Sequence, residues 1–311
     1  MGSLSLLWNL FQLKQNEHKT REQLEEIREK KLRRVLKTAY EKSPYYRRAF
    51  EEAGIDGESL MELPLSAFPV MDKDALMQHF EEIVTVSDLT QEGLRQFDGD
   101  GRDSKGKYLG KYHVVHSSGS TGIPRYFVYD DKAWGQMLLG IIRGALWDMS
   151  MPQILRLLSG GLRILYIAAT DGRYGGAMAV GDGIDGVGAK QLFLDIKTPL
   201  SQWISSIRAF GPNLVIGYPS AIKILGELVE KGEVQAQVCR VISCGEPLSP
   251  GLRSYLEKVF QAVVVNFYGA SESLALGVET DGSEGMYLFD DMNYIEVLDG
   301  KMYLTCLYNL V

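Results

Sequence analysis

Cysteine is scarce in this chain, and its scarcity narrows the class of protein. Only three cysteines occur among 311 residues, at positions 239, 244 and 306, and no two of them form a CxxC pair. So sparse and odd a set excludes the disulfide framework of a small secreted protein. We therefore expect a reducing, cytoplasmic location.

Basic charge is also in short supply. The 33 lysines and arginines are outnumbered by 40 aspartates and glutamates, which gives a formal net charge of −7. Such a chain has no basic field with which to hold the phosphate backbone of a nucleic acid. We expect no nucleic-acid partner.

Long apolar runs and targeting signals are missing as well. No stretch approaches the roughly 18 apolar residues that a membrane helix requires. The first eight residues place no basic segment before their apolar ones, and Leu6 stands where a myristoylation signal has serine or threonine. We expect a soluble protein with no membrane partner and no targeting signal.

The secondary-structure pattern changes near residue 107. Before it, a capping box from Thr20 to Gln23 opens a charged amphipathic helix that Pro44 ends, and the rest reads as helix and loop. After it, short β-prone runs alternate with helical segments, which predicts βαβ units and a largely parallel sheet. The expected strands are 112–116, 125–129, 162–168, 213–216, 238–243 and 262–267, and the expected helices are 131–147, 200–209, 219–231 and 250–260.

The pattern as a whole predicts an α/β fold whose sheet is flanked by helices. Residues 1–107 would form the helical part of one large domain and residues 108–311 its ligand-binding part. Two helices carry a cap followed by proline, at Thr198 and at Ser249. The runs 286–289, 294–298 and 302–307 predict a small antiparallel patch at the end of the chain.

Glycine is abundant: 33 of the 311 residues are glycine, which exceeds the roughly 7% that is average for proteins. One glycine-rich loop is of particular interest. Hydroxyl side chains and glycines alternate between two predicted strands, at Ser117, Ser118, Gly119, Ser120, Thr121 and Gly122. Backbone N–H groups and hydroxyls of such a loop can point into one concavity and bind an anion, most plausibly a polyphosphate. No GK[ST] or GxSxG pattern is present in it, and an ordinary hairpin turn is the alternative.

This loop resembles the phosphate loop of the adenylate-forming (AMP-forming) ligases, within them the phenylacetate–CoA ligase and coenzyme F390 synthetase branch. Residues 244–249, Cys-Gly-Glu-Pro-Leu-Ser, are similar to the Gly-Glu-Pro segment of that family. Residues 266–272, Asn-Phe-Tyr-Gly-Ala-Ser-Glu, are similar to its Tyr-Gly-x-[Ser/Thr]-Glu motif. The three motifs occur in the family's order over most of the chain.

The resemblance implies a role for each matching residue. Thr121 and its neighbours would hold the β- and γ-phosphates of ATP, and Glu272 would help to hold Mg²⁺. The AMP part of the nucleotide would be bound by Gly245, Glu246, Pro247, Tyr268, Gly269 and Ser271, with Tyr268 against adenine and Ser271 on the α-phosphate. Gly217, Tyr218 and Pro219 would help to form the acid pocket, where an aromatic side chain suits an aryl acid.

The reaction that the resemblance implies is attack by a substrate carboxylate on the α-phosphorus of ATP, with CoA as a possible later acceptor. A carboxylate is already anionic at neutral pH, so alignment and charge neutralisation suffice without a general base. The family continues into a small domain with a catalytic lysine, and this sequence stops at Val311 before it. We expect that lid to be absent, through truncation, incomplete recording or degeneration, and without it thioester formation would fail.

Several alternatives stay open at this point. The acceptor could be something other than CoA, as in the biosynthesis of an aromatic antibiotic, or the chain could be a noncatalytic nucleotide-binding or acid-binding remnant. Taken singly, Tyr268 could be a core residue, Glu272 a solvated helix start and Gly245 a turn. Residues 181–186 match GxGxxG, but Asp182 and Asp185 would repel a pyrophosphate, so we interpret them as a surface loop. The oligomeric state is open between a monomer and a homodimer.

Overall fold

The computed structural model describes the whole chain except residues 1–2, 100–105, 118–123, 171–174, 183–188 and 283. The described residues form two compact units. Unit 1 comprises Met1–Glu17 and Leu138–Phe289, and unit 2 comprises His18–Met137 and Asp290–Val311. All the described strands follow residue 107, where they alternate with helices, and as a domain boundary this position stays a prediction.

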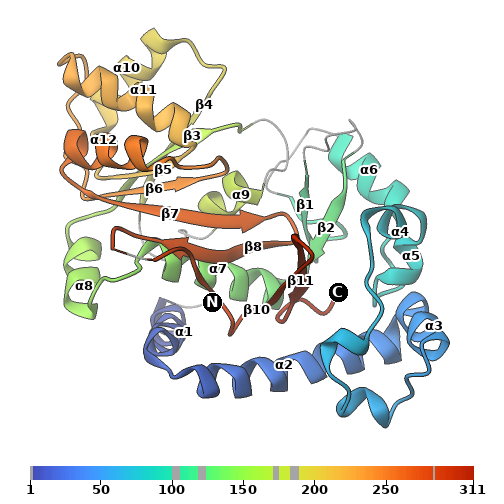
Figure 1. Ribbon diagram of the computed structural model, residues 1–311. Coiled ribbons are helices and arrows are strands. Elements are labelled where there is room, and N and C mark those ends of the chain that lie inside the picture. The colour runs from blue at the N-terminus through green and yellow to red at the C-terminus, as the bar shows by residue number, and fades with distance from the viewer. Residues whose placement is uncertain (1–2, 100–105, 118–123, 171–174, 183–188, 283) are drawn as a thin grey trace. The chain divides into compact units, whose positions relative to one another are not determined.

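A seven-stranded sheet forms the centre of unit 1 (Figure 1). Its strands, in spatial order, are β4 (Lys190–Asp195), β3 (Arg163–Ala168), β5 (Leu214–Gly217), β6 (Arg240–Cys244), β7 (Val263–Ala270), β8 (Ser273–Glu279) and β9 (Tyr287–Leu288). The first five are parallel, and β8 and β9 add antiparallel neighbours beyond β7. The predicted α/β class with a largely parallel sheet is confirmed.

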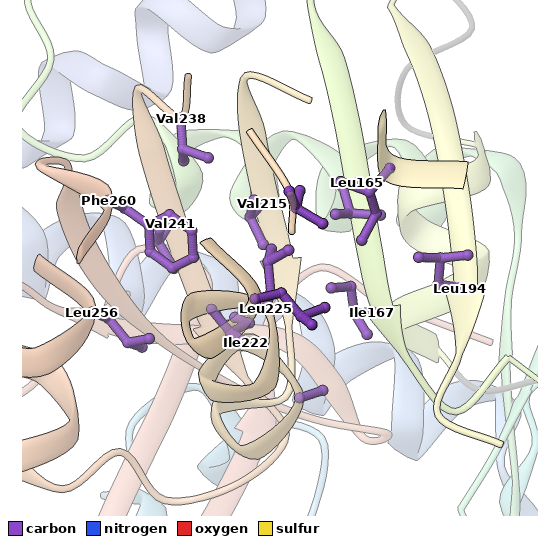
Figure 2. Packing of buried hydrophobic residues seen from close by; sticks show 14 of the residues in the cluster. Leu165, Ile167, Leu194, Val215, Ile222, Leu225, Val238, Val241, Leu256 and Phe260 are labelled. Atoms are coloured by element: carbon purple, nitrogen blue, oxygen red, sulfur yellow. The ribbon is translucent and has the colours of Figure 1, made fainter. Parts of the chain in front are cut away.

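Three helices cover one face of this sheet: α10 (Leu200–Phe210), α11 (Pro219–Glu230) and α12 (Pro250–Phe260). Ile222 and Leu225 of α11 point at aliphatic residues of the strands (Figure 2). Their cluster includes the fully buried Leu165, Ile167, Val215, Val241, Leu256 and Val264. Burial of this apolar surface is what holds the helices on the sheet.

The opposite face of the sheet carries α8 (Met151–Ser159), α9 (Gly175–Asp182) and the part of α7 (Asp131–Ala145) that belongs to unit 1, with α1 (Ser3–Gln15) beside them. The backbone of α7 comes very close to β7. A Cβ atom at Gly144 would lie 2.5 Å from the ring of Phe267. The sequence analysis did not predict five of these elements: the helices α1, α8 and α9 and the strands β4 and β8.

The two predicted helix starts in unit 1 had different outcomes. Ser249 caps α12, because its side chain accepts a hydrogen bond from the N–H of Leu252, as predicted. The predicted cap at Thr198 is wrong. Thr198 belongs to a turn in which its N–H donates to the carbonyl of Asp195, so α10 begins only at Leu200, after Pro199.

Unit 2 contains helices and two small hairpins. Its helices are α2 (Arg21–Lys42), α3 (Pro44–Glu52), α4 (Lys73–Gln78), α5 (Phe80–Ile83) and α6 (Gln91–Gly99), with 3₁₀ turns at Ser59–Met61 and Leu65–Ala67 and another at Asn16–His18, where the chain passes from unit 1 to unit 2. The capping box of Thr20 and Gln23 opens α2, as predicted. No helix among the described residues is both long and apolar enough to span a bilayer.

The hairpins of unit 2 are antiparallel. β1 (His113–His116) pairs with β2 (Tyr126–Tyr129), and β10 (Asn293–Leu298) pairs with β11 (Lys301–Cys306). The second hairpin confirms an antiparallel patch near the end of the chain. The run 286–289, which we assigned to the same patch, instead gives β9 and pairs with β8 in the large sheet.

Candidate functional site

The carboxyl ends of β5, β6 and β7 lie side by side in unit 1. In the register of the sheet, Gly217 is opposite Ser243, and Cys244 is opposite Phe267. Each strand therefore delivers one predicted site segment to the same edge: 217–219, 245–247 and 268–272. Open parallel sheets bind their ligands at this edge.

The backbone at the end of β5 is fixed by close packing. A Cβ atom at Gly217 would lie 2.1 Å from the carbonyl oxygen of Ile167, so no larger residue fits there. The next residue, Tyr218, continues the ladder, because its N–H donates to the same carbonyl at 3.0 Å. Pro219 then begins α11 and is buried. Tyr218 is thus held at a defined place on the edge.

The end of β6 packs against that tyrosine. Gly245 has φ +79°, and a Cβ atom on it would lie 2.6 Å from Cε1 of Tyr218. The neighbouring Glu246 accepts a hydrogen bond from the N–H of Ser220 at 3.3 Å. A carboxylate is favourable at this position, the first turn of α11, because the helix dipole is positive there. Pro247 is exposed.

The turn between β7 and β8 carries the last segment. Tyr268 is 36% exposed, and the register shifts between it and Ala270. A Cβ atom at Gly269 would lie 2.4 Å from the carbonyl oxygen of Leu274, so this bulge requires glycine. Tyr268 is therefore no core residue.

Ser271 and Glu272 form the tip of this hairpin, where Ser271 is partly exposed and Glu272 is exposed. No helix starts at Glu272, because β8 begins one residue later. The two alternatives that treated Tyr268 as core and Glu272 as a helix start are thereby wrong. Their functional roles, like those of Gly217 and Gly245, stay predictions.

Two titratable groups beneath the edge are neutral at physiological pH. Burial, assisted by the negative charge of Glu246, raises the pKa of the Cys244 thiol to about 12. Burial, with smaller contributions from Cys244 and Tyr218, also moves the pKa of Tyr166 far above its usual range. The sequence did not single out Tyr166, because β3 is apolar on both faces and its pattern gives no sign of which face is special.

The glycine-rich loop lies largely outside the described residues, which is where Ser118, Gly119, Ser120, Thr121 and Gly122 fall. Its flanks belong to unit 2, where the N–H of Ser117 donates to the carbonyl of Arg125 at 3.0 Å and extends the β1–β2 hairpin. Ser117 Oγ and Arg125 Nε are buried, and neither has a hydrogen-bond partner among the described residues. The phosphate-binding role of this loop stays a prediction.

The magnesium prediction can be compared with the carboxylates present. Among the described residues, no group of three or more His, Cys, Asp or Glu side chains could hold a metal ion. Mg²⁺ is commonly bound by one or two carboxylates together with substrate phosphates, and the Glu272 carboxylate at the hairpin tip fits a site of that kind.

The segment that matches GxGxxG is described only in part. Its first two residues, Gly181 and Asp182, end α9, and residues 183–186 lie outside the described residues.

The chain is similar to known proteins in sequence and in structure. No protein-family model matches the chain. It is 25% identical over 297 residues to a phenylacetate-coenzyme A ligase of Thermus thermophilus, covering 90% of this chain and 58% of that protein. It is 24% identical over 287 residues to a phenylacetate-coenzyme A ligase of Escherichia coli, covering 89% and 59%. The chain therefore spans less than two thirds of the length of these curated relatives.

Solved structures show the same fold. A crystal structure of 2-hydroxyisobutyryl-CoA ligase in the thioesterification state, in complex with 2-HIB-AMP and CoA, matches with a TM-score of 0.68 at 20% identity, over 94% of this chain and 61% of that one. An open conformation of the same ligase matches with a TM-score of 0.65 at 20% identity, over 91% and 61%.

Proposed function

Because the resemblance to the phenylacetate–CoA ligase branch of adenylate-forming ligases is confirmed in sequence and in fold, we propose that the protein activates a carboxylic acid with ATP. The products are an acyl-adenylate and pyrophosphate, and the acyl group then passes to CoA or to another acceptor. One observation carries the proposal: the three predicted site segments 217–219, 245–247 and 268–272 lie at one edge of the parallel sheet, with the Tyr218 ring against Gly245.

The residues at this edge suit the binding of an adenylate. Gly245 and Gly269 have no side chains, so a nucleotide can approach their backbone closely. The exposed ring of Tyr268 offers a flat surface on which adenine can stack. Ser271 can donate a hydrogen bond to the α-phosphate. When bound, Mg²⁺ neutralises charge on the phosphates, and Glu272 is the carboxylate that would hold it.

Catalysis in this scheme consists of alignment and electrostatics. The carboxylate of the acid needs no deprotonation, so the chain has to hold it in line with the α-phosphorus. Residues 117–122 would hold the β- and γ-phosphates through N–H groups and hydroxyls. The ring of Tyr218 packs on Gly245, and in this proposal the acid binds beside the AMP against that aromatic face, which favours an aryl acid.

An acid-dependent exchange assay tests the proposal. The 311-residue chain is incubated with ATP, Mg²⁺, labelled pyrophosphate and a panel of aryl and alkyl acids, phenylacetate included, and AMP and ATP binding are titrated separately. We expect label to enter ATP only when a suitable acid is present. Binding of ATP with no exchange for any acid would favour a noncatalytic binding protein instead.

The Thr121→Ala variant serves as a test of the loop. Loss of its hydroxyl should weaken ATP binding by about tenfold, since a hydrogen bond to a charged group contributes roughly 1.5 kcal/mol. AMP lacks the β- and γ-phosphates and should bind as it does to the wild type. Equal losses for the two nucleotides would contradict the assignment of Thr121.

A further inference from the structure

An apolar cavity of about 100 Å³ lies inside unit 1, on the sheet face that α7, α8 and α9 cover. Its lining is almost wholly aliphatic and includes Ile164, Ile216 and Ile242 from the strands, with Ala145, Leu157 and Val180 from the three helices. A dry aliphatic cavity of about 150 Å³ admits benzene. This cavity is smaller and could hold a short alkyl group.

The cavity ends close to the edge where the acid would bind. Ile216 and Ile242 lie opposite each other in the register of β5 and β6. Tyr218 and Cys244 follow two residues later in the chain, which corresponds to about 6.6 Å along a strand. The cavity-lining Ile216 and Ile242 therefore stand within one pleat repeat of the edge where the acid pocket is predicted.

Tyr166 is the large side chain at this boundary. It stands two residues after Ile164 on β3, so both point to the cavity face, and its register partner on β5 is Ile216. Its hydroxyl reaches α9, because a Cβ atom at Gly176 would lie only 2.7 Å from it. Tyr166 is 3% exposed. Tyr166 therefore stands on the cavity face, between the cavity-lining Ile164 and the carboxyl end of β3.

The helix α9 connects the same two places. Gly176 packs on the Tyr166 hydroxyl, and Val180, one turn later, lines the cavity. A shorter side chain at position 166 would free space beside Gly176, which lies one turn of α9 before the cavity-lining Val180.

We propose that Tyr166 limits the length of the acid by closing the apolar cavity off from the acid pocket. This inference rests on the proposed function and deepens it: the wild-type substrate is a compact acid whose ring or short chain ends at Tyr166. Acids with longer straight chains are excluded by the phenol ring, although an apolar space that could hold their ends lies directly behind it.

The test compares Tyr166→Ala with Tyr166→Phe and the wild type. Binding of hexanoate, octanoate and decanoate is measured by titration calorimetry, and activation of the same acids by pyrophosphate exchange. For Tyr166→Ala, octanoate should bind about 15-fold more tightly than hexanoate, since each buried methylene contributes about fourfold. Tyr166→Phe keeps the ring and should show the short-acid preference of the wild type.

A second substitution tests whether a gain in octanoate binding depends on the cavity or on a general loss of packing around position 166. Ala145→Phe, introduced into the Tyr166→Ala background, places a ring in the cavity and should abolish the gain for octanoate. Should Tyr166→Ala fail to fold, as judged by circular dichroism, Tyr166→Leu takes its place, with a gain in the same direction.

The two hypotheses fail in different ways. If the wild type exchanges pyrophosphate with compact acids while octanoate binds no better to Tyr166→Ala than to the wild type, the inference about Tyr166 is overturned and the proposed function stands. If no acid supports exchange, the proposed function fails. The calorimetric comparison of octanoate still decides the inference in that case.

Discussion

The two faces of the seven-stranded sheet are built differently. On the α10–α12 face, the strands present aliphatic residues that pack closely against the helices, as Leu165 and Ile167 of β3 illustrate. On the α7–α9 face, the same strand presents Ile164, which lines a cavity, and Tyr166, whose hydroxyl packs on Gly176 of α9. A single strand therefore serves a structural face and a face suited to a ligand.

The two faces of the sheet meet different requirements. A face that only has to hold helices can be packed to the density of an organic crystal, which gives the greatest stability. An unfilled cavity loses those contacts and lowers stability, so the cavity on the α7–α9 face is a feature that substrate binding can explain.

The largest effect is expected for Gly217→Ala. The added Cβ atom would lie 2.1 Å from the backbone carbonyl of Ile167, which cannot rotate away, so the β3–β5 pairing must shift. We expect a loss of about 4 kcal/mol or more in the free energy of unfolding, measured by urea denaturation.

Gly245→Ala is the matched control for that change. Its Cβ atom would meet the ring of Tyr218 at 2.6 Å, and a ring can move, although φ +79° adds strain. A loss of about 1–2 kcal/mol is expected. Equal losses for the two variants would mean that strand pairing is not what fixes position 217.

The second prediction compares one core position on each face. Leu225→Ala, on the packed α11 face, removes a fully buried side chain and should cost about 3 kcal/mol. Ala145→Val, on the cavity face, adds atoms where space exists and should leave stability unchanged or raise it by up to about 1 kcal/mol. Thermal and urea unfolding measure both. Destabilisation by Ala145→Val would show that the cavity closes in solution.

The sequence predicted the elements of the α10–α12 face better than those of the α7–α9 face. The helices 219–231 and 250–260 were recognisable because their apolar residues recur at helical spacing and proline marks their first turn. On the other face, α8, α9 and β4 carry weaker signals, and α9 contains three glycines in eight residues. Local propensity therefore gave little warning of a helix whose formation depends on packing against the sheet.

The sequence predicted site residues at positions where only one residue type, glycine, fits the structure. Gly217, Gly245 and Gly269 were chosen from motifs, and each proves to lie where a Cβ atom would collide with a neighbour. Tyr166 could not be found in that way. Its place next to Gly176 depends on the register of β3 with β5 and on α9, and neither is written in a local pattern.

The third prediction concerns the solvent-facing end of the site. The Glu272→Gln substitution removes the charge that would hold Mg²⁺ and keeps the size of the side chain, so pyrophosphate exchange should fall about tenfold to a hundredfold. AMP affinity should stay within about twofold, because AMP binding does not depend on the metal bridge between phosphates. Stability should be unchanged, since the residue lies at the tip of a hairpin and is not buried. Full activity of the Glu272→Gln variant would remove the metal assignment.

The last prediction concerns the rate at which the Cys244 thiol, on the sheet face with the cavity, is alkylated in the native protein. With a pKa of about 12, only about one thiol in ten thousand is ionised at pH 8, and only the thiolate reacts with iodoacetamide. In a Cys239→Ser/Cys306→Ser background, Cys244 should therefore stay unlabelled at pH 8 in the native protein and react readily in urea. Because the folded-state pKa is raised, the native rate should rise about tenfold for each pH unit between about 8 and 10. Labelling at pH 8 as fast as in the unfolded chain would show that this thiol is open to water, and that the cavity face is not the dry surface that a hydrocarbon would need.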